Sequence, residues 1–222
     1  MSDLPPTGRV VLGVTGASGA AYAIRLLELL LESGREVHLV VSEYGRQLLH
    51  DEAGVRQLTL EDLLPHVFGS GDVPVGLVRR PIPQHPDDWK NRLIVHPNRN
   101  VGAVIASGSF LHDGMVVMPC SSTSLGAIAT GSGSNLLSRA AAVALKERRR
   151  LILCHRETPL TLIDIENMRT LTMAGAIICP TNPGLYLLPQ SVPEMVDFMV
   201  GKVLDLLGIR HKLNTRWESR HR

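Results

Sequence analysis

The stretch RVVLGVTGASGAAYAIRLLELLLESGREVHLVV, residues 9–41, decides the fold. Residues 9–14 and 36–41 are short apolar runs of strand length, and residues 20–31 between them have the apolar spacing of a buried helix. Gly34 lies where that helix should end. A strand, a helix and a second strand in this order predict a parallel β-α-β unit.

The same alternation continues to the end of the chain. We expect further strands at 115–118, 151–154 and 176–179, with helices over 163–173 and 193–207 among those that follow them. This predicts one α/β domain with a doubly wound parallel sheet, Rossmann-like and of the flavodoxin type. We place the domain at 9–209, between tails at 1–8 and 210–222. Residues 54–101 break the pattern with prolines and charges and predict a loop-rich excursion, after which order returns at 101–105.

Composition excludes several classes of protein. The formal net charge of the 222-residue chain is only +2, and its basic residues are mostly dispersed, which argues against nucleic-acid binding. No apolar run approaches the roughly 20 residues of a membrane span. The three cysteines lie far apart without the spacing of metal ligands, as expected of buried thiols in a reducing compartment. We therefore expect a cytoplasmic protein without a metal.

A second informative stretch, RAAAVALKERRRLILCHRETP at 139–159, places cations on an apolar helix. Arg139 and Lys146 are seven residues apart, two turns along one stripe of a helix. Arg156 and Glu157 follow a short apolar strand, at the end where parallel sheets bind ligands. This pattern predicts an anionic substrate beside an acid-base carboxyl. We interpret residues 148–150 as a solvated helix end, but not Arg139.

The first predicted loop could hold a phosphate. Residues 13–19 have glycine at every third position and lead directly into a helix, whose backbone amides together with Ser18 could bind the anion. The Gly-x-Gly pair of dinucleotide-binding loops is missing, so a mononucleotide phosphate fits better. An ordinary tight turn without a ligand also explains these residues.

Three further strand ends carry hydroxyl groups. Ser42 follows the second strand, Ser107 and Ser109 lie in ASGSF, and SSTS at 121–124 opens another helix. Each serine could simply cap a helix, and for Ser42 alone that is the better interpretation. Together they predict a cleft rich in amides and hydroxyls for a phosphorylated, planar ligand.

Three more residues have both a structural and a functional interpretation. Glu52 is either a solvated carboxylate near a helix end or part of the site. Tyr186 either anchors a loop or supplies a hydroxyl, and Lys202 is either a surface residue or a cation of the site.

These motifs together resemble the flavin prenyltransferase family, the UbiX group of flavoproteins related to cysteine decarboxylases. The resemblance runs from Arg9 to Trp217 and is weakest over 54–100. Its spaced motifs are TGASG at 15–19, ASGSF at 106–110, MPCSSTSLGAIATG at 118–131, NLLSRAAAVALKERR at 135–149, RETPL at 156–160, PGLY at 183–186 and RW at 216–217.

The resemblance implies a homo-dodecameric, metal-independent enzyme. Such enzymes transfer a dimethylallyl group from dimethylallyl phosphate to N5 and C6 of reduced FMN, and UbiD-type decarboxylases use the prenylated FMN. The implied FMN-binding residues are Gly16, Ala17, Ser18, Ser42, Ser107, Ser121, Ser122, Thr123, Ser124 and Arg156. Those implied for the allylic phosphate are Arg139, Lys146, Tyr186 and Lys202.

The resemblance also implies catalytic roles. Glu157 would be the acid-base residue, and Lys146 would assist the departing phosphate. Ser18 with Glu52 would handle protons at the flavin, and Trp217 would close the site, from its own or a neighbouring subunit. Fixed cationic and hydroxyl donors can stabilise a leaving phosphate without a metal.

Three functional alternatives remain at this point, two of which bind FMN. One is an FMN-dependent oxidative decarboxylase acting on a cysteine-derived substrate, in which the Arg139, Lys146, Arg156 and Glu157 set would have no purpose. The other is a non-catalytic FMN-binding partner subunit, for which acid-base residues would be unnecessary. An aromatic-acid decarboxylase that works alone is a further reading, and an assay with and without a partner would separate it.

Overall fold

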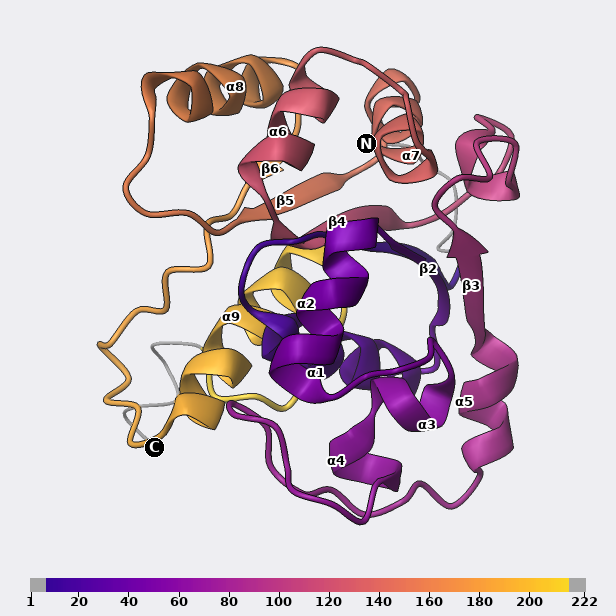
Figure 1. The fold of residues 1–222 in the computed structure, drawn as a ribbon, viewed down its shortest axis with the longest axis vertical. Coiled ribbons are helices and arrows are strands. Elements are labelled where there is room, and N and C mark those ends of the chain that lie inside the picture. The colour runs from indigo at the N-terminus through magenta and orange to yellow at the C-terminus, as the bar shows by residue number, and fades with distance from the viewer. Residues whose placement is uncertain (1–6, 216–222) are drawn as a thin grey trace.

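A computed structural model describes residues 7–215 of the chain. Over this range six strands form one sheet in which every neighbouring pair is parallel, in the order β3-β2-β1-β4-β5-β6 (Figure 1). The strands are β1 (Arg9–Val14), β2 (Glu36–Val41), β3 (Leu93–Pro97), β4 (Gly114–Cys120), β5 (Leu151–His155) and β6 (Ile177–Ile178). Leaving out the edge strand β3, this is the strand order of flavodoxin, so the predicted fold class is confirmed.

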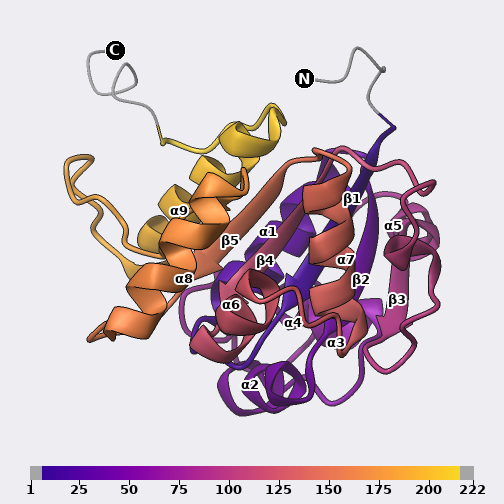
Figure 2. The same ribbon diagram turned by 90° about the horizontal axis from the view of Figure 1, so that it is seen from above.

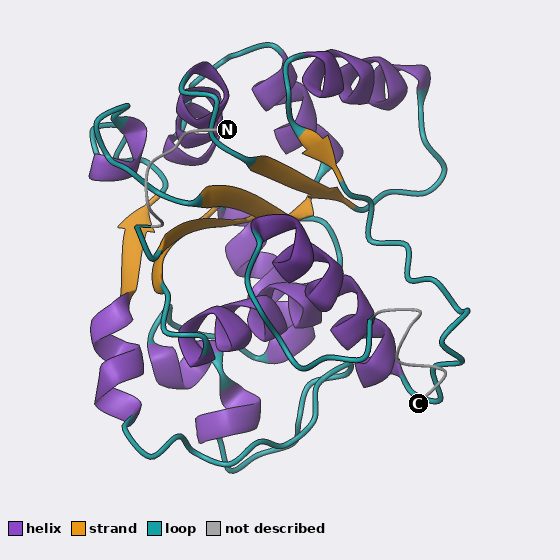
Figure 3. Ribbon diagram, turned by 180° about the vertical axis from the view of Figure 1, so that it is seen from behind, coloured by secondary structure: helices purple, strands orange, loops and turns teal. Residues whose placement is uncertain are grey.

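Helices cover both faces of the sheet (Figures 1 and 3). One face carries α1 (Ala20–Glu32) and α9 (Val192–Leu207), with α2 (Glu43–Ala53) beside them. The other face carries α6 (Ser122–Ala129), α7 (Leu136–Lys146) and α8 (Leu162–Met173), which Figure 2 shows from above. The chain therefore changes faces between β1, which leads to α1, and β4, which leads to α6.

Alternation along the strands builds the two cores. In β1, Val10, Leu12 and Val14 pack on the side of α1 and α9, whereas Val11 packs on the side of α7. All of these side chains are nearly or fully buried. Because both faces are covered, the strands read as continuous apolar runs, which is why the sequence revealed them.

The excursion between β2 and β4 contains structure that the sequence pattern did not predict. It holds α3 (Leu60–Leu63), α4 (Pro65–Phe68), α5 (Pro86–Arg92) and the edge strand β3. Trp89 of α5 is buried in the core. β3 is five residues long and ends in Pro97, so it carried too little apolar signal to be recognised. Residues 104–106 form a 3₁₀ helix (Val104–Ala106) rather than a strand.

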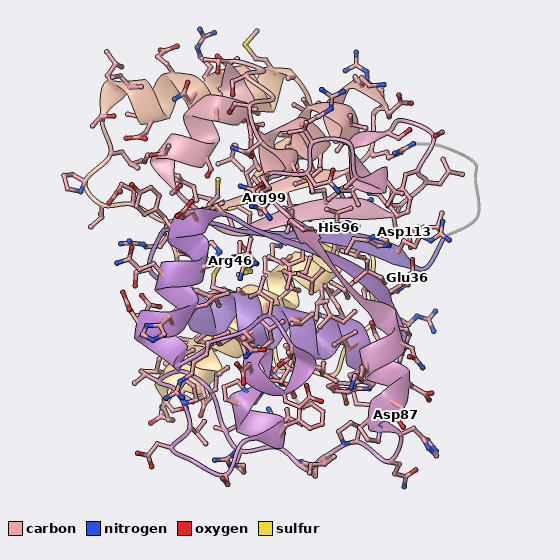
Figure 4. The ribbon with its side chains drawn as sticks, turned by 45° about the vertical axis from the view of Figure 1, so that its right-hand side comes forward. Glu36, Arg46, Asp87, His96, Arg99 and Asp113 are labelled. Atoms are coloured by element: carbon pink, nitrogen blue, oxygen red, sulfur yellow. The ribbon has the colours of Figure 1, made fainter. Side chains whose placement is uncertain are left out.

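Hydrogen bonds and packing attach both ends of the described chain to the domain. The carboxylate of Asp113, which is labelled in Figure 4, accepts hydrogen bonds from the backbone amides of Thr7 and Gly8 and from the Arg35 guanidinium. At the other end, Thr215 is buried against Gly201 of α9, where a Cβ atom would lie 2.3 Å from the Thr215 methyl group. Residues 210–215, placed in a tail by the sequence analysis, thus pack against the domain.

A buried ionic cluster joins the excursion to α1 and α9. The Glu28 carboxylate lies 2.7 Å from His66 Nε2 of α4 and 2.6 Å from an Arg25 guanidinium nitrogen. Arg25 Nε in turn donates to Asp197 of α9 over 2.7 Å. Burial would raise the pKa of Glu28, but the hydrogen bonds from His66 and Arg25 and their charges hold it below its ordinary value. Glu28 therefore balances buried positive charge.

Replacing Glu28 with Gln should lower the free energy of unfolding by about 3–5 kcal/mol, because it leaves the buried Arg25 guanidinium without a full countercharge. Urea unfolding followed by circular dichroism measures the change. The matched control is Glu32→Gln, an exposed carboxylate on the same helix, which should change stability by no more than about 0.5 kcal/mol. Equal effects of the two substitutions would contradict a structural role for the cluster.

Candidate functional site

A buried threonine joins the two loops at the point where the chain changes faces. The Thr15 hydroxyl donates to the Pro119 carbonyl over 2.8 Å and accepts from the Ser121 amide over 2.7 Å. Thr15 has no exposed surface. In open α/β sheets ligands bind at this point, outside the carboxyl ends of the strands. The sequence analysis did not single out Thr15.

Close packing explains the glycine in the first loop. A Cβ atom on Gly16 would lie 2.4 Å from the Cβ of Tyr44, in the first turn of α2. A Cβ on Gly45 would lie 2.6 Å from the Val14 carbonyl oxygen. The loop at 15–19 therefore rests directly on α2, with Ala17 buried and Ser18 exposed at the edge of the sheet.

The amides at the start of α1 already have an acceptor. Glu52, near the end of α2, accepts hydrogen bonds from the amides of Gly19 and Ala20, over 2.9 and 2.8 Å. A carboxylate is favourable there because the amino end of a helix is electropositive. The amides of Gly19 and Ala20 therefore have an acceptor within the protein, and the role of Gly16, Ala17 and Ser18 at a phosphate stays a prediction. The same contact brings Glu52 to the loop that carries Ser18, as their predicted shared role requires.

Two predicted hydroxyls are helix caps. Ser42 accepts from the Gly45 amide over 3.0 Å and begins α2, and Ser121 accepts from the Ser124 amide over 3.3 Å and begins α6. Ser122 and Ser124 are half-buried in the first turn of α6, and Thr123 is exposed. A capping serine uses its oxygen as acceptor and keeps its hydroxyl proton to donate. Ser121 donates that proton to Ser124 Oγ over 3.2 Å, whereas the Ser42 cap can donate to a ligand.

Ser107 and Ser109 lie away from this edge. They follow the 3₁₀ helix and precede the start of β4, and the carbonyls of Gly108 and Phe110 accept hydrogen bonds from Arg149, which lies between the end of α7 and the start of β5. They therefore lie at the amino edge of the sheet. The prediction that Ser107 stands at the carboxyl end of a strand is wrong, because residues 104–106 do not extend into one.

The two cations of α7 also lie apart from the other predicted phosphate ligands. Arg139 is exposed, although the sequence analysis did not interpret it as part of a solvated helix end, and Lys146 is exposed and paired with Glu147 beside Gly108. α7 covers the opposite face of the sheet from α9, which carries Lys202. Within one chain, Arg139 and Lys146 do not join Tyr186 and Lys202 in one site.

Arg156 and Glu157 stand at the carboxyl edge as predicted. The Arg156 amide donates to the Cys120 carbonyl over 3.1 Å, which places the residue next to the start of α6. Its buried Nε has no hydrogen-bond partner among residues 7–215, so the guanidinium can still donate to a ligand. Glu157 is exposed and accepts from the Thr158 amide over 3.0 Å. Farther along the same edge of the sheet, Arg46 of α2 and Arg99 after β3 add exposed positive charge (Figure 4).

A buried polar chain lies behind Arg156. Ser122 Oγ lies 3.0 Å from His155 Nε2, and the Ser122 hydroxyl donates to Asp164 in the first turn of α8. Burial lowers the pKa of His155, while the hydrogen bonds from Ser122 and Thr161 lower the pKa of Asp164 to about 2. A neutral imidazole thus donates to Ser122, which donates to an ionised carboxylate. This chain joins the end of β5 to the first turns of α6 and α8.

A cavity of about 540 Å³ opens beyond β6. The loop between β6 and α9 supplies Tyr186, whose ring meets Phe198 edge-on at 5.5 Å, and α9 supplies Lys202. Cys179, at the end of β6, lines the same cavity. The Thr181 amide donates to the His155 carbonyl over 3.0 Å, so this loop begins beside Arg156. The predicted pair of Tyr186 and Lys202 does share one cavity.

The remaining predictions concern Trp217, metal binding and membrane spans. Trp217 lies outside the described residues. Within residues 7–215, no group of three His, Cys, Asp or Glu side chains is placed to hold a metal ion. None of the helices in the same range is both long and apolar enough to cross a membrane.

Replacing Asp164 with Asn should lower the free energy of unfolding at neutral pH by about 2 kcal/mol, because hydrogen bonds to an ionised carboxylate are lost. The pKa of Asp164 falls from 3.8 to about 2 on folding, so its contribution is complete above pH 4 and disappears as the pH falls toward 2. Urea unfolding of both proteins across this range tests the difference. If the difference in free energy of unfolding between the two proteins stays constant with pH, the low pKa of Asp164 is contradicted.

Comparison with known proteins agrees with this arrangement. The flavoprotein family model matches residues 3–204. Flavin prenyltransferase UbiX of Halalkalibacterium halodurans is 41% identical over 210 residues, covering 95% of this chain and 93% of that protein. A UbiX structure in complex with FMN and dimethylallyl pyrophosphate superposes with a TM-score of 0.72 at 36% identity, covering 90% of this chain and 92% of that one.

A dodecameric FMN-dependent UbiX-like protein of Escherichia coli O157:H7 superposes with a TM-score of 0.75 at 33% identity, covering 94% of this chain and 98% of that one. In these matches the similarity extends over almost the full length of both proteins. The chain therefore belongs to the UbiX family of flavin prenyltransferases, within the flavoproteins.

Proposed function

We propose that this protein transfers a dimethylallyl group from dimethylallyl phosphate to reduced FMN and that UbiD-type decarboxylases use the prenylated product. The observation that carries the proposal is that residues suited to FMN and residues suited to the allylic phosphate lie at the ends of two neighbouring strands. Arg156 and Glu157 follow β5, and the cavity of Tyr186 and Lys202 begins at the end of β6. The UbiX relative that was crystallised with FMN and dimethylallyl pyrophosphate supports this pairing of ligands.

The residues at the switch of faces fit FMN. The Arg156 Nε, buried without a partner among residues 7–215, suits an acceptor on the flavin or its phosphate. Gly16, Ala17 and Ser18 would contact the cofactor from one loop, with Ser42 and residues 121–124 as hydroxyl donors from two others. When bound and reduced, FMN supplies the nucleophile that accepts the dimethylallyl group.

The residues near β6 fit the allylic phosphate. The Tyr186 hydroxyl and the Lys202 ammonium group would donate to the phosphate oxygens and stabilise the negative charge that grows as the carbon–oxygen bond breaks. Glu157, one residue beyond Arg156, would hold or accept the proton that the transfer releases. Ser18, next to the amides that bind Glu52, would relay a proton with that carboxylate. Tyr186 and Lys202 would thus stabilise the leaving phosphate without a metal ion.

The exposed apolar residues of α8 support contact with a neighbouring subunit. Apolar side chains on α8 are largely exposed: Leu162 and Ile163 at 72%, Ile165 at 49% and Met173 at 76%. Such a patch is typical of an interface between proteins, and the Escherichia coli relative is dodecameric. We include a homo-dodecamer in the proposal. Arg139, Lys146 and Ser107, which lie apart from their own cleft, would then act in the cleft of a neighbour, and Trp217 would close a site.

The proposal includes a cytoplasmic location. Cys120, Cys154 and Cys179 carry no disulfide, as expected of thiols in a reducing compartment. The near-balanced net charge of +2 offers no broad surface for nucleic acid.

Anaerobic incubation with reduced FMN and dimethylallyl phosphate should convert the flavin to a species heavier by one five-carbon unit, measured by mass spectrometry. Addition of EDTA should leave the yield unchanged, because Tyr186, Lys202 and the arginines would neutralise the phosphate. An unchanged flavin mass with native, folded protein would refute the proposed transfer. A yield that fell with EDTA and returned with a divalent cation would refute its independence of metal.

Glu157→Gln should bind FMN with native affinity and slow prenyl transfer by roughly 100-fold to 10,000-fold, the usual contribution of a general acid or base. Flavin fluorescence measures binding and single-turnover kinetics measures transfer. Glu61→Gln, an exposed carboxylate on α3, is the matched control and should keep the native rate. A Glu157 variant as fast as this control would remove Glu157 from the acid-base role.

Ile163→Glu should dissociate the assembly, because it places a charge in the proposed apolar interface. Light scattering after gel filtration measures the molar mass. Ile82→Glu, at a position that is 60% exposed in the excursion, should leave the mass native. If Ile163→Glu folds and keeps the native mass, α8 does not form the interface.

A further inference from the structure

Two cysteines occupy facing positions on neighbouring strands. β5 and β6 pair in parallel with Ile152 opposite Ile177 and Leu153 opposite Ile178. The ladder continues past β6, because the Cys179 amide donates to the Leu153 carbonyl over 2.9 Å. Cys154 and Cys179 are therefore the next residues in register. Neighbouring strands lie about 4.8 Å apart, within the Cα separation that a disulfide accepts.

Both thiols point to the same face of the sheet. Ile152, Cys154, Ile177 and Cys179 pack in the core on the side of α9, whereas Leu153 and Ile178, which alternate with them, pack on the opposite side. The Cys154 thiol donates a hydrogen bond to the Cys179 sulfur. The strand register and the shared face therefore bring the two thiols together.

Only one of the two thiols is accessible. Cys154 is fully buried, whereas Cys179 is half-buried and lines the 540 Å³ cavity with Lys202. The hydrogen bond from Cys154 and the positive charge of Lys202 lower the pKa of Cys179. The same hydrogen bond, together with burial, raises the pKa of Cys154. A small oxidant that enters the cavity therefore meets a thiol with increased thiolate character, supported by a second thiol behind it.

We propose that Cys179 and Cys154 form a reversible disulfide when a peroxide enters the cavity, which makes this wall an oxidation site. The Cys179 thiolate attacks one oxygen of hydrogen peroxide, the O–O bond breaks, and the departing hydroxide takes up a proton to become water. The Cys154 sulfur then attacks the sulfur of the Cys179 sulfenic acid, and the S–O bond breaks. The second oxygen leaves as water with the Cys154 proton. Two thiols lose two electrons, and one peroxide gains them.

The disulfide would alter the cavity. Cys179 is followed by the loop that carries Asn182 and Tyr186, and β6 itself has only two residues. The Cβ atoms of a disulfide lie closer together than those of ordinary strand neighbours, so the bond draws this short segment toward β5. It also removes a thiol from the surroundings of Lys202. Oxidation is therefore a way to change the part of the site that holds Tyr186 and Lys202.

The test uses the full-length protein, reduced, desalted and treated with a small excess of hydrogen peroxide. Remaining thiols are then alkylated with iodoacetamide under denaturing conditions, and the products are analysed by intact-mass and peptide mass spectrometry. We expect loss of two hydrogens, alkylation at Cys120 alone, and a linked pair of peptides containing Cys154 and Cys179. Dithiothreitol should restore alkylation at all the cysteines.

The variants separate this assignment from nonspecific oxidation. Cys120 is fully buried on the opposite face, where burial raises its pKa to about 12, so Cys120→Ser should form the same disulfide as the native chain. Cys154→Ser should instead leave a sulfenic acid at Cys179 that dimedone traps. Cys179→Ser should form no disulfide. Circular dichroism verifies that each variant is folded.

Two results would overturn the proposal: alkylation of all cysteines in the peroxide-treated native protein, or a disulfide that persists in folded Cys179→Ser. If Cys154→Ser fails to fold, Cys154→Ala takes its place, and absence of a dimedone adduct at Cys179 in the folded variant would also overturn it. The readout is the state of the thiols, so it does not depend on prenyl transfer. Failure of the proposed function would leave this test intact.

Discussion

The site depends on one buried hydroxyl. Thr15 connects the carbonyl of Pro119 to the amide of Ser121 and so joins the loop after β1 to the loop after β4. These loops lead to helices on opposite faces of the sheet. The Pro119 carbonyl also accepts from the Thr15 amide over 3.2 Å, but without the Thr15 hydroxyl the Ser121 amide would lose its acceptor. Ser18 on one loop and the serines of α6 on the other owe their relative positions to it. The Arg156 amide donates to the Cys120 carbonyl, which fixes Arg156 beside the same two loops.

The parts of the structure that local patterns determine could be predicted from the sequence. Buried strands, the helix after the glycine loop and the serine caps of α2 and α6 all depend on neighbouring residues. β3 was missed because an edge strand needs less apolar sequence than a central one, and its partner is far away in the chain. Contacts such as Glu52 with the amides of α1, or Ser122 with His155 and Asp164, join separate elements and leave no local signal. The resemblance identified site residues, but it could not say which of them share a cleft.

The charged residues discussed above fall into three groups by their position in the fold. Arg25 and Glu28 are buried and Asp197 is half-buried. The two carboxylates are paired with Arg25 and with Arg80 of the excursion, so these charges attach the excursion to the domain and are not available to a ligand. Arg156, Arg46, Arg99 and Lys202 lie near the carboxyl ends of strands, where an anion can reach them. Arg139 and Lys146 belong to a third position, on the face opposite α9. Residue type alone does not distinguish these roles, whereas burial and position on the sheet do.

The short length of β6 has a consequence for the order in which ligands bind. β1, β4 and β5 have almost wholly buried backbones in the middle of the sheet, whereas β6 is an edge strand of two residues followed by a long loop. Segments with few buried contacts and edge hydrogen bonds open at lower free energy than core strands. The wall formed by Arg156 and the serine loops is thus preformed, while the wall formed by Tyr186 is adaptable. Under the proposed function, FMN would therefore meet a preformed wall, and the wall that carries Tyr186 would adjust around the second ligand.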